Sequence, residues 1–497
     1  MNVNLAQIIE GHPADSTALI SRGRITTYGA LRDQVALARG ALSELGVGKG
    51  DVVVLLCGNS RYFVVAYLAA LGLGAVACPL NPTSPAPEIE KELSVVRPRA
   101  VVIEPAAFDM WRRIDASVAG AIGAVIATEG HSLDGAHTFE ELPGTAPVPI
   151  VEVDPSHHAV YMFTSGTAGS PKAAILTHGN LSANIDQTNT VDRIRPSDVV
   201  FGVLPIYHIF GLNVVIGLTL AVGGSVVLVQ RFDPVSAMET IAERAVTVMP
   251  GAPSMWIALA QLDHPSRDSF AGVRLALSGA SRLPVTTAQS MKDRFGLEIR
   301  EGYGLTEASP VVTNSIGTEW LPGSVGTPVK DLELRVVDED GEDVLVGDTG
   351  EIWVRGPNVF IGYLDDPEAT ARVLTADGWL RTGDIGVIDD DGHLFIVDRA
   401  KDLVIVSGFN VFPAEVEGVI NTHPDVLESS VIGTAHPHTG ESVRAYVVTR
   451  PGVHLDEDAL IDHCRSRLAR YKCPTKVLFV EALPRNLIGK VTRYALR

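Results

Sequence analysis

Short apolar stretches alternate with segments of helical periodicity over roughly the first 320 residues, and this alternation constrains the fold more than any other feature. Val52–Leu56 has the composition of a buried strand, and residues 61–73 follow it with a helical pattern. Such alternation predicts parallel sheets covered by helices. A chain of 497 residues is too long for a single hydrophobic core, so we expect several packed units.

The sequence pattern changes after about residue 320. Residues 326–398 contain short strand-like stretches separated by turns such as Asp338-Glu339-Asp340-Gly341, which predicts a small antiparallel barrel or sandwich. The last hundred residues have a strand, helix and strand pattern typical of a small α+β domain. We therefore predict an N-terminal domain over residues 1–398, with a β-barrel-like part from about 326, and a C-terminal domain over residues 399–497 joined by a short hinge.

Composition excludes several functional classes. The formal net charge of -19 disfavours binding to nucleic acid or to anionic lipid, because both repel an acidic surface. The four cysteines lack the spacing of a zinc site or a disulfide framework, which favours reduced thiols. The first residues show no secretory pattern, and the apolar run over 214–230 is short and interrupted by glycines. We expect a cytoplasmic protein without a transmembrane segment.

An apolar strand leads into a run of hydroxyls, glycines and a lysine that could hold a polyphosphate. Backbone N–H groups of small residues approach phosphate oxygens closely, hydroxyls add donors, and the ammonium adds charge. The run does not fit the pattern of a Walker-type loop, because Pro171 precedes the lysine and Ala173 follows it. Its residues are Thr164, Ser165, Gly166, Thr167, Ala168, Gly169, Ser170, Pro171 and Lys172.

This run resembles the phosphate-binding signature of the adenylate-forming (AMP-binding) superfamily, and further motifs follow in that family's order. Residues 205–211 resemble its histidine-containing substrate segment, and 381–384 and 398–402 resemble later motifs. Two segments resemble its adenine and metal segments: Ser278, Gly279 and Ala280, then Glu301, Gly302, Tyr303, Gly304, Leu305, Thr306 and Glu307. Such ordered agreement would be very hard to reach by chance. Within the superfamily, residues 177–184 and 306–312 look most like those of fatty acid:CoA ligases.

The resemblance implies a role for individual residues in making an acyl-adenylate from ATP. Glu307 would hold Mg²⁺ against the phosphates, and Thr306 would donate to the α-phosphate. Asp384 would accept hydrogen bonds from the ribose hydroxyls, with Arg399 on the same sugar. His208 would orient the incoming carboxylate.

A second group of residues would serve the change between two half-reactions. Lys490 would bridge the acid and the α-phosphate, where a compact ammonium can stabilise a charge that moves during displacement. The small domain would then rotate about Lys401, and Gly408 would line the tunnel for the pantetheine arm of coenzyme A. Asp398 stands where many members of the family have glycine.

The sequence indicates the type of reaction more narrowly than it indicates the acid substrate. In peptide synthetases, which belong to the superfamily that this chain resembles, an acidic residue just after the histidine segment binds the α-ammonium of the substrate. Residues 210–213 carry no acid, so the resemblance disfavours an amino-acid substrate. We predict an AMP-forming fatty acid:CoA ligase that releases pyrophosphate and AMP. Alternatives are an aromatic acid:CoA ligase, an enzyme that loads a carrier protein, and a catalytically silent module that senses nucleotide or acid. The pattern says nothing about oligomeric state.

Overall fold

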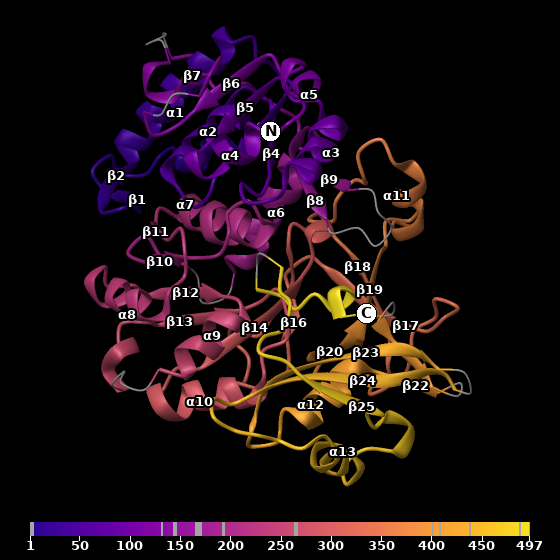
Figure 1. Ribbon diagram of the computed structural model, residues 1–497. Helices are drawn as coiled ribbons and strands as arrows, with labels where there is room; N and C mark the ends of the chain where they lie inside the picture. Colours follow the sequence, from indigo (N-terminus) through magenta and orange to yellow (C-terminus); the bar gives the residue numbers. More distant parts are fainter. Residues whose placement is uncertain are drawn as a thin grey trace.

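The computed structural model describes ten stretches of the chain (Figure 1). They are residues 4–130, 133–142, 147–164, 171–190, 194–262, 267–399, 402–406, 409–436, 439–486 and 489–496. Three groups of predicted site residues therefore lie outside the described residues: 165–170 of the phosphate run, Lys401 and Gly408.

A seven-stranded sheet forms the first layer of the N-terminal part, in the order β7-β6-β5-β3-β4-β8-β9. Its pairs are parallel except for the antiparallel pair β8 and β9. The strands are β3 (Val52–Leu56), β4 (Val76–Pro79), β5 (Ala100–Ile103), β6 (Ala124–Ala127), β7 (His137–Thr138), β8 (His158–Thr164) and β9 (Lys172–Thr177).

Helices cover both faces of this sheet. Successive side chains of its strands point to opposite faces and are buried on both, so each face needs a covering layer. Val53 and Leu55 join the core that contains α1 and α2, whereas Val54 and Leu56 join the core that contains α3. The helices are α1 (Tyr28–Glu44), α2 (Arg61–Gly72), α3 (Ala86–Val96), α4 (Phe108–Trp111), α5 (Ala116–Gly120) and, after β9, α6 (His178–Thr188).

A nine-stranded sheet forms the second layer, in the order β16-β15-β14-β13-β12-β10-β11-β1-β2. Its central pairs are parallel and its edge pairs antiparallel. The strands are β1 (Thr17–Ser21), β2 (Arg24–Thr27), β10 (Val199–Gly202), β11 (Ser225–Leu228), β12 (Val248–Gly251), β13 (Leu275–Ser278), β14 (Ile299–Gly304), β15 (Val311–Asn314) and β16 (Thr327–Pro328).

The two sheets share one core. That core contains side chains of both sheets and of α2, α6 and the π-helix η4 (Phe210–Leu218), with α7 (Thr219–Val222) continuing η4. Figure 1 shows α6 and α7 between the upper and lower sheets. A separate core on the far face of the second sheet takes in α8 (Pro234–Glu243), α9 (Pro253–Ala260) and α10 (Val285–Phe295).

A four-stranded antiparallel sheet follows, in the order β17-β18-β19-β20. This is the region in which the sequence predicts a small barrel or sandwich, and its strands pair in a single path from β17 to β20. The elements are β17 (Glu333–Val337), β18 (Gly350–Arg355), α11 (Pro367–Val373), β19 (Leu380–Ile388) and β20 (Leu394–Arg399).

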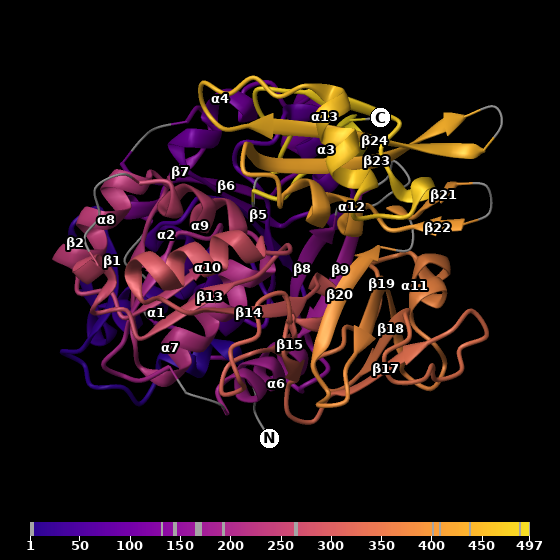
Figure 2. The same cartoon turned by 90° about the horizontal axis from the view of Figure 1, so that it is seen from below.

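The C-terminal part has its own sheet and its own hydrophobic core. Figure 2 shows this unit beside β19 and β20, with α12 next to β20. Its elements are β21 (Val404–Val406), β22 (Phe409–Val411), α12 (Pro413–Ile420), β23 (Val426–His436), β24 (Gly440–Thr449), α13 (Glu457–Arg465) and β25 (Lys476–Phe479).

The predicted architecture of parallel sheets with helices, an antiparallel β unit and a small C-terminal α+β unit is confirmed. The domain boundary at residues 398 and 399 stays a prediction, although β20 does end at Arg399. All four cysteines are buried free thiols. Among the described residues, no helix has the length and apolar character needed to cross a bilayer.

Candidate active site

The phosphate run connects two paired strands. β8 ends at Thr164 and β9 begins at Lys172, and these two residues lie opposite each other in the antiparallel register. Both ends of the run are therefore fixed by the sheet. The Nζ of Lys172 lies 5.4 Å from the ring centroid of Tyr363, within cation–π range.

Glu307 is held from two directions beside this lysine. The hydroxyl of Tyr363 donates to Glu307 Oε1 at 2.7 Å, and the backbone N–H of Phe360 donates to the Glu307 carbonyl at 2.8 Å. Burial and the charge of Glu307 raise the pKa of Tyr363, so its hydroxyl stays a donor. Thr306 precedes Glu307 in the short helix η6 (Thr306–Ala308). One carboxylate oxygen of Glu307 thus has a fixed donor.

Asp384 is the centre of a second polar cluster and is buried. Tyr303 donates its hydroxyl proton to Asp384 Oδ2 at 2.6 Å, and Arg399 Nε lies 3.0 Å from Oδ1. Asp384 and Arg399 face each other across the β19–β20 ladder, which places their side chains together. The predicted ribose pair is therefore adjacent in space, with Tyr303 as a third member.

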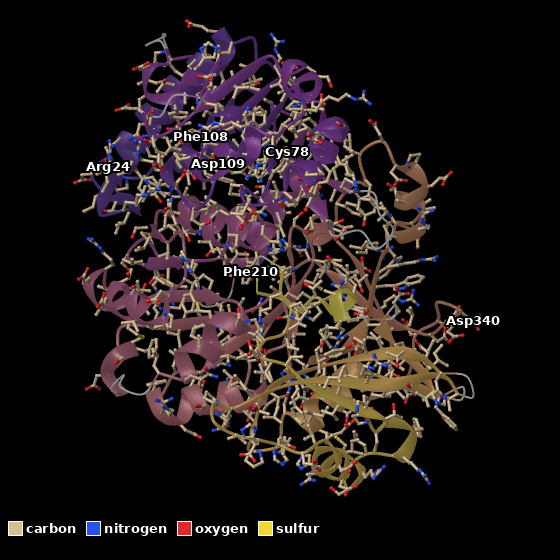
Figure 3. All side chains as sticks on the ribbon, viewed as in Figure 1. Arg24, Cys78, Phe108, Asp109, Phe210 and Asp340 are labelled. Carbon is tan, nitrogen blue, oxygen red and sulfur yellow. The ribbon has the colours of Figure 1, made fainter. Side chains whose placement is uncertain are left out.

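The predicted adenine segments form the walls next to these clusters. Ser278 ends β13, Ala280 has φ +70°, and a Cβ on Gly279 would lie 2.8 Å from Cε1 of Phe210. Figure 3 shows Phe210 in the middle of the molecule, where η4 begins. On β14, the carbonyl of Pro310 occupies the space that a Cβ of Gly304 would need, so this position demands glycine.

Three other residues of the segment 301–305 make contacts that support the structure around the site. Gly302 and Leu305 lie at and just after β14, and both contact the neighbouring β15 region through the backbone. The buried carboxylate of Glu301 accepts backbone N–H bonds from Leu283 at 3.3 Å and Gly323 at 3.1 Å. Burial raises the pKa of Glu301 to about 7. Glu301 therefore ties two loops together around the site.

The C-terminal tail reaches this region through Gly489 and Lys490. The turn is closed by hydrogen bonds from Asn486 N–H to the Lys490 carbonyl at 2.8 Å and from Lys490 N–H to Asn486 Oδ1 at 2.9 Å. Gly489 has φ +78°, and a Cβ there would overlap Ser254 Oγ of α9. In Figure 1 the tail runs from the C-terminal unit towards the middle of the molecule.

His208 lies within electrostatic range of Lys490. Burial first, and then the charge of Lys490, lower the pKa of His208 to about 4, so its imidazole is neutral at physiological pH. The Nδ1 of His208 lies 3.3 Å from the backbone N–H of Phe210, which donates to it. The only proton on a neutral ring then sits on Nε2.

Two contributions to the site were not assigned from the sequence. The sequence assigns no role to Tyr363, and only the fold shows that its hydroxyl meets Glu307. Asn213 donates from Nδ2 to the carbonyls of Leu181 and Ser309 at 3.2 and 2.7 Å, which fixes η4 under the site. Asn213 is a lone amide in an apolar run, and the sequence around it does not indicate that it binds Leu181 or Ser309.

The donor set fits a magnesium ion held jointly with substrate phosphates. Within the described stretches, no three His, Cys, Asp or Glu side chains come together to hold a metal ion. Mg²⁺ commonly binds one or two carboxylates and completes its shell with phosphate oxygens and water. Glu307, positioned by Tyr363 near Lys172, is suited to that arrangement.

Comparison with known proteins agrees with this geometry. The family model for AMP-binding enzymes matches residues 5–364, and that for the AMP-binding enzyme C-terminal domain matches residues 415–490. The chain therefore belongs to the family of AMP-binding enzymes.

Curated relatives cover nearly the whole chain. A 3-[(3aS,4S,7aS)-7a-methyl-1,5-dioxo-octahydro-1H-inden-4-yl]propanoyl:CoA ligase of Mycobacterium tuberculosis is 37% identical, over 97% of this chain and 96% of its own length. 4-Coumarate–CoA ligase 5 of Oryza sativa subsp. japonica is 34% identical, over 92% and 86%. A long-chain-fatty-acid–CoA ligase of Yersinia pestis is 34% identical, over 97% and 92%.

Solved structures superpose on the whole chain. ATP-bound MatB from Rhodopseudomonas palustris is 33% identical and superposes with a TM-score of 0.93, over 100% of this chain and 98% of its own. The apo form of the same protein gives a TM-score of 0.82 at the same coverage. The present structure is therefore closer to the ATP-bound form.

Proposed function

We propose that this enzyme is an AMP-forming acid:CoA ligase that works in two half-reactions. The first joins a carboxylic acid to the α-phosphate of ATP and releases pyrophosphate, and the second transfers the acyl group to the thiol of coenzyme A and releases AMP. The contact between the C-terminal tail and the N-terminal part, where a Cβ on Gly489 would overlap Ser254 Oγ of α9, is the observation that carries this proposal. It supports a role for the neighbouring Lys490 ammonium at the place where the acid and the α-phosphate would react.

In the first half-reaction, the groups of the site have separate tasks. The run from Thr164 to Lys172 would hold the phosphates, while Asp384 and Arg399 would hold the ribose. Mg²⁺, bound by Glu307, would neutralise charge on the phosphate oxygens. The walls formed by residues 278–280 and 301–305 would enclose the adenine.

The acid itself would be oriented by His208 and Lys490. A neutral imidazole with its proton on Nε2 can donate to a carboxylate oxygen without forming an ion pair that holds the acid too tightly. The Lys490 ammonium would stabilise the charge that builds up on the oxygens around phosphorus as the acid attacks. Both residues favour the transition state over the separate reactants.

The second half-reaction requires Lys490 to leave. Enzymes that this chain resembles rotate their small domain, and we place the pivot at Lys401 and the pantetheine passage at Gly408. A glycine suits a passage in which a side chain would block the thiol arm. Both assignments rest on the sequence motif.

For the substrate we propose an apolar monocarboxylic acid, with fatty acids as the first class and aromatic acids as the second. Asn213, the polar side chain closest in sequence to His208 on η4, is committed to two backbone carbonyls, and no carboxylate follows Phe210 to bind an ammonium group. The relatives named above act on ring-containing as well as long-chain acids, which keeps the aromatic alternative in view.

A panel of acids tests this proposal. AMP release would be measured with CoA for fatty acids of increasing chain length, benzoate, 4-coumarate and malonate, each with and without ATP. We expect the highest kcat/KM for fatty acids and negligible activity with malonate. Carrier-bound pantetheine in place of CoA separates a carrier-loading enzyme, and acid-dependent exchange of labelled pyrophosphate into ATP separates a silent module, which would show none.

A further inference from the structure

The backbone of Asp398 is part of a sheet in the N-terminal part, whereas its carboxylate contacts the C-terminal unit. Its main chain lies in β20, opposite Ile385 of β19, and the next residue, Arg399, pairs with Asp384. Its buried side chain accepts the backbone N–H of Ala414 at 2.7 Å, at the start of α12 in the C-terminal unit. The same carboxylate accepts the N–H of Arg399 at 2.8 Å.

Arg493 completes the connection from the C-terminal tail. Its Nη1 donates to Asp398 Oδ1 at 2.8 Å and lies 3.4 Å from Asp402 Oδ2, while Nη2 donates to both oxygens of Glu417 at 2.9 Å. Arg493 is itself largely buried, with its side chain 19% exposed. A planar guanidinium suits such a multidentate role, which an ammonium could not reproduce.

These contacts cross the place where the small domain would turn. The β19–β20 ladder keeps Asp398 with the N-terminal part, whereas Ala414 and Arg493 belong to the C-terminal unit. A large rotation about residues 400 and 401 would pull Asp398 away from both. By contrast, the Glu417–Arg493 pair lies within the C-terminal unit and can survive the movement.

One of the contacts of Asp398 is made by the same tail segment that carries Lys490. Arg493 follows Lys490 by three residues, and the end of this segment is fixed by Tyr446, whose hydroxyl donates to the Leu496 carbonyl at 2.7 Å. Orientation of the C-terminal unit on Asp398 therefore sets the orientation of the tail that reaches His208 and Ser254.

We propose that Asp398 is a positioning residue that holds the adenylating orientation through Ala414 and Arg493 and must release both before thioester formation. This rests on the two-step function proposed above. A glycine at position 398 could make neither contact, because both contacts are made by the side-chain carboxylate.

The test measures the two half-reactions separately in the full-length enzyme. Pyrophosphate exchange reports adenylation, and CoA consumption with supplied acyl-AMP reports thioesterification. For Asp398→Asn and Asp398→Gly we expect adenylation to fall about tenfold, with thioesterification unchanged or faster. Arg493→Lys should behave in the same direction, and Asp398→Asn combined with Arg493→Lys should be no worse than either change alone.

Two further variants keep the test specific. Lys476→Met breaks an ion pair with Glu457 that lies wholly within the C-terminal unit, and it should alter neither rate. Lys490→Ala tests the underlying function, because it should abolish adenylation alone. If Lys490→Ala separates the half-reactions while the Asp398 variants slow both equally or neither, the positioning role is wrong. If Lys490→Ala also slows both equally, the proposed two-step function has failed.

Discussion

The hydroxyl of Tyr363 donates to Oε1 of Glu307 at 2.7 Å, while the Nζ of Lys172 lies 5.4 Å from the centroid of the same aromatic ring. Partners that orient a metal ligand commonly contribute 10- to 100-fold to metal affinity or activity, as an order of magnitude. Tyr363→Phe should therefore raise the Mg²⁺ concentration for half-maximal adenylation about tenfold, with little change in the KM for the acid. A magnesium titration of pyrophosphate exchange measures this, with Tyr161→Phe, which loses the hydrogen bond between the Tyr161 hydroxyl and His158 Nδ1, as the control. Identical titrations for both variants would show that Glu307 needs no such support.

Asp384 should make the enzyme sensitive to the sugar of its nucleotide. A hydrogen bond to a charged acceptor contributes roughly 1.5–3 kcal/mol, so 2′,3′-dideoxy-ATP should have a kcat/KM about 10- to 100-fold below that of ATP. Asp384→Asn should lower kcat/KM for ATP and remove most of this discrimination, since the dideoxy nucleotide has no hydroxyls to lose. Kinetics with both nucleotides at saturating acid decide the matter. Undiminished discrimination in the variant would place the ribose elsewhere.

Close packing of Gly279 against Phe210 should restrict the site sterically. A Cβ at position 279 would lie 2.8 Å from Cε1 of the Phe210 ring, so Gly279→Ala must push the ring aside. We expect kcat/KM for the acid to fall about tenfold, in line with the usual 1–3 kcal/mol cost of overpacking, and to recover partly when Phe210→Leu is added. Gly418→Ala is the matched control, because nothing lies within 4 Å of a Cβ at that helical position. Lack of rescue by the second substitution would mean that the clash is with something other than Phe210.

Acidification should destabilise the fold through His178. Burial, and then the neighbouring His157, lower the pKa of His178 from 6.5 to about 3, and its Nδ1 accepts the N–H of Leu5 at 3.1 Å. Because the unfolded chain binds this proton more readily, the stabilising contribution is complete above pH 6.5 and decreases as the pH falls towards the folded value. One such group contributes at most about 1.4 kcal/mol per pH unit to the free energy of unfolding.

Urea unfolding between pH 5 and 8 measures that contribution. His178→Gln should give a shallower loss of unfolding free energy below pH 6.5 than the unmodified protein, even though the variant is less stable at pH 8. Equal slopes for the two proteins would show that His178 already binds its proton in the folded state.

Sequence reasoning reached the architecture because it depends on local patterns, and the same patterns named most residues of the candidate site. Apolar strands of four to seven residues and helices between them were readable directly, and motifs such as residues 301–307 keep their residues together along the chain. The π-helical course of residues 210–218 was not predicted, since an apolar run fits a strand or any kind of helix equally well. Its geometry depends on Asn213 reaching carbonyls from two other elements.

Relationships between distant residues could not be derived in this way. Nothing in the sequence near His208 indicates that Lys490 lowers its pKa, and nothing near Asp398 indicates a pair with Arg493. The partners of the Glu301 carboxylate, the N–H groups of Leu283 and Gly323, likewise have no signal in the sequence. Such partners are set by how the domains pack, which local propensity does not encode.

Lys490→Ala tests the central claim most directly, by assaying the two half-reactions in the same preparation. The variant should lose adenylation by about two to three orders of magnitude, as expected for removal of one transition-state stabiliser, while converting supplied acyl-AMP and CoA to thioester at close to the normal rate. Lys472→Ala, which changes another lysine of the C-terminal unit that pairs with Glu415 in that unit, should not reproduce the selective loss of adenylation. An equal loss of both half-reactions in Lys490→Ala, or normal adenylation, would contradict the account.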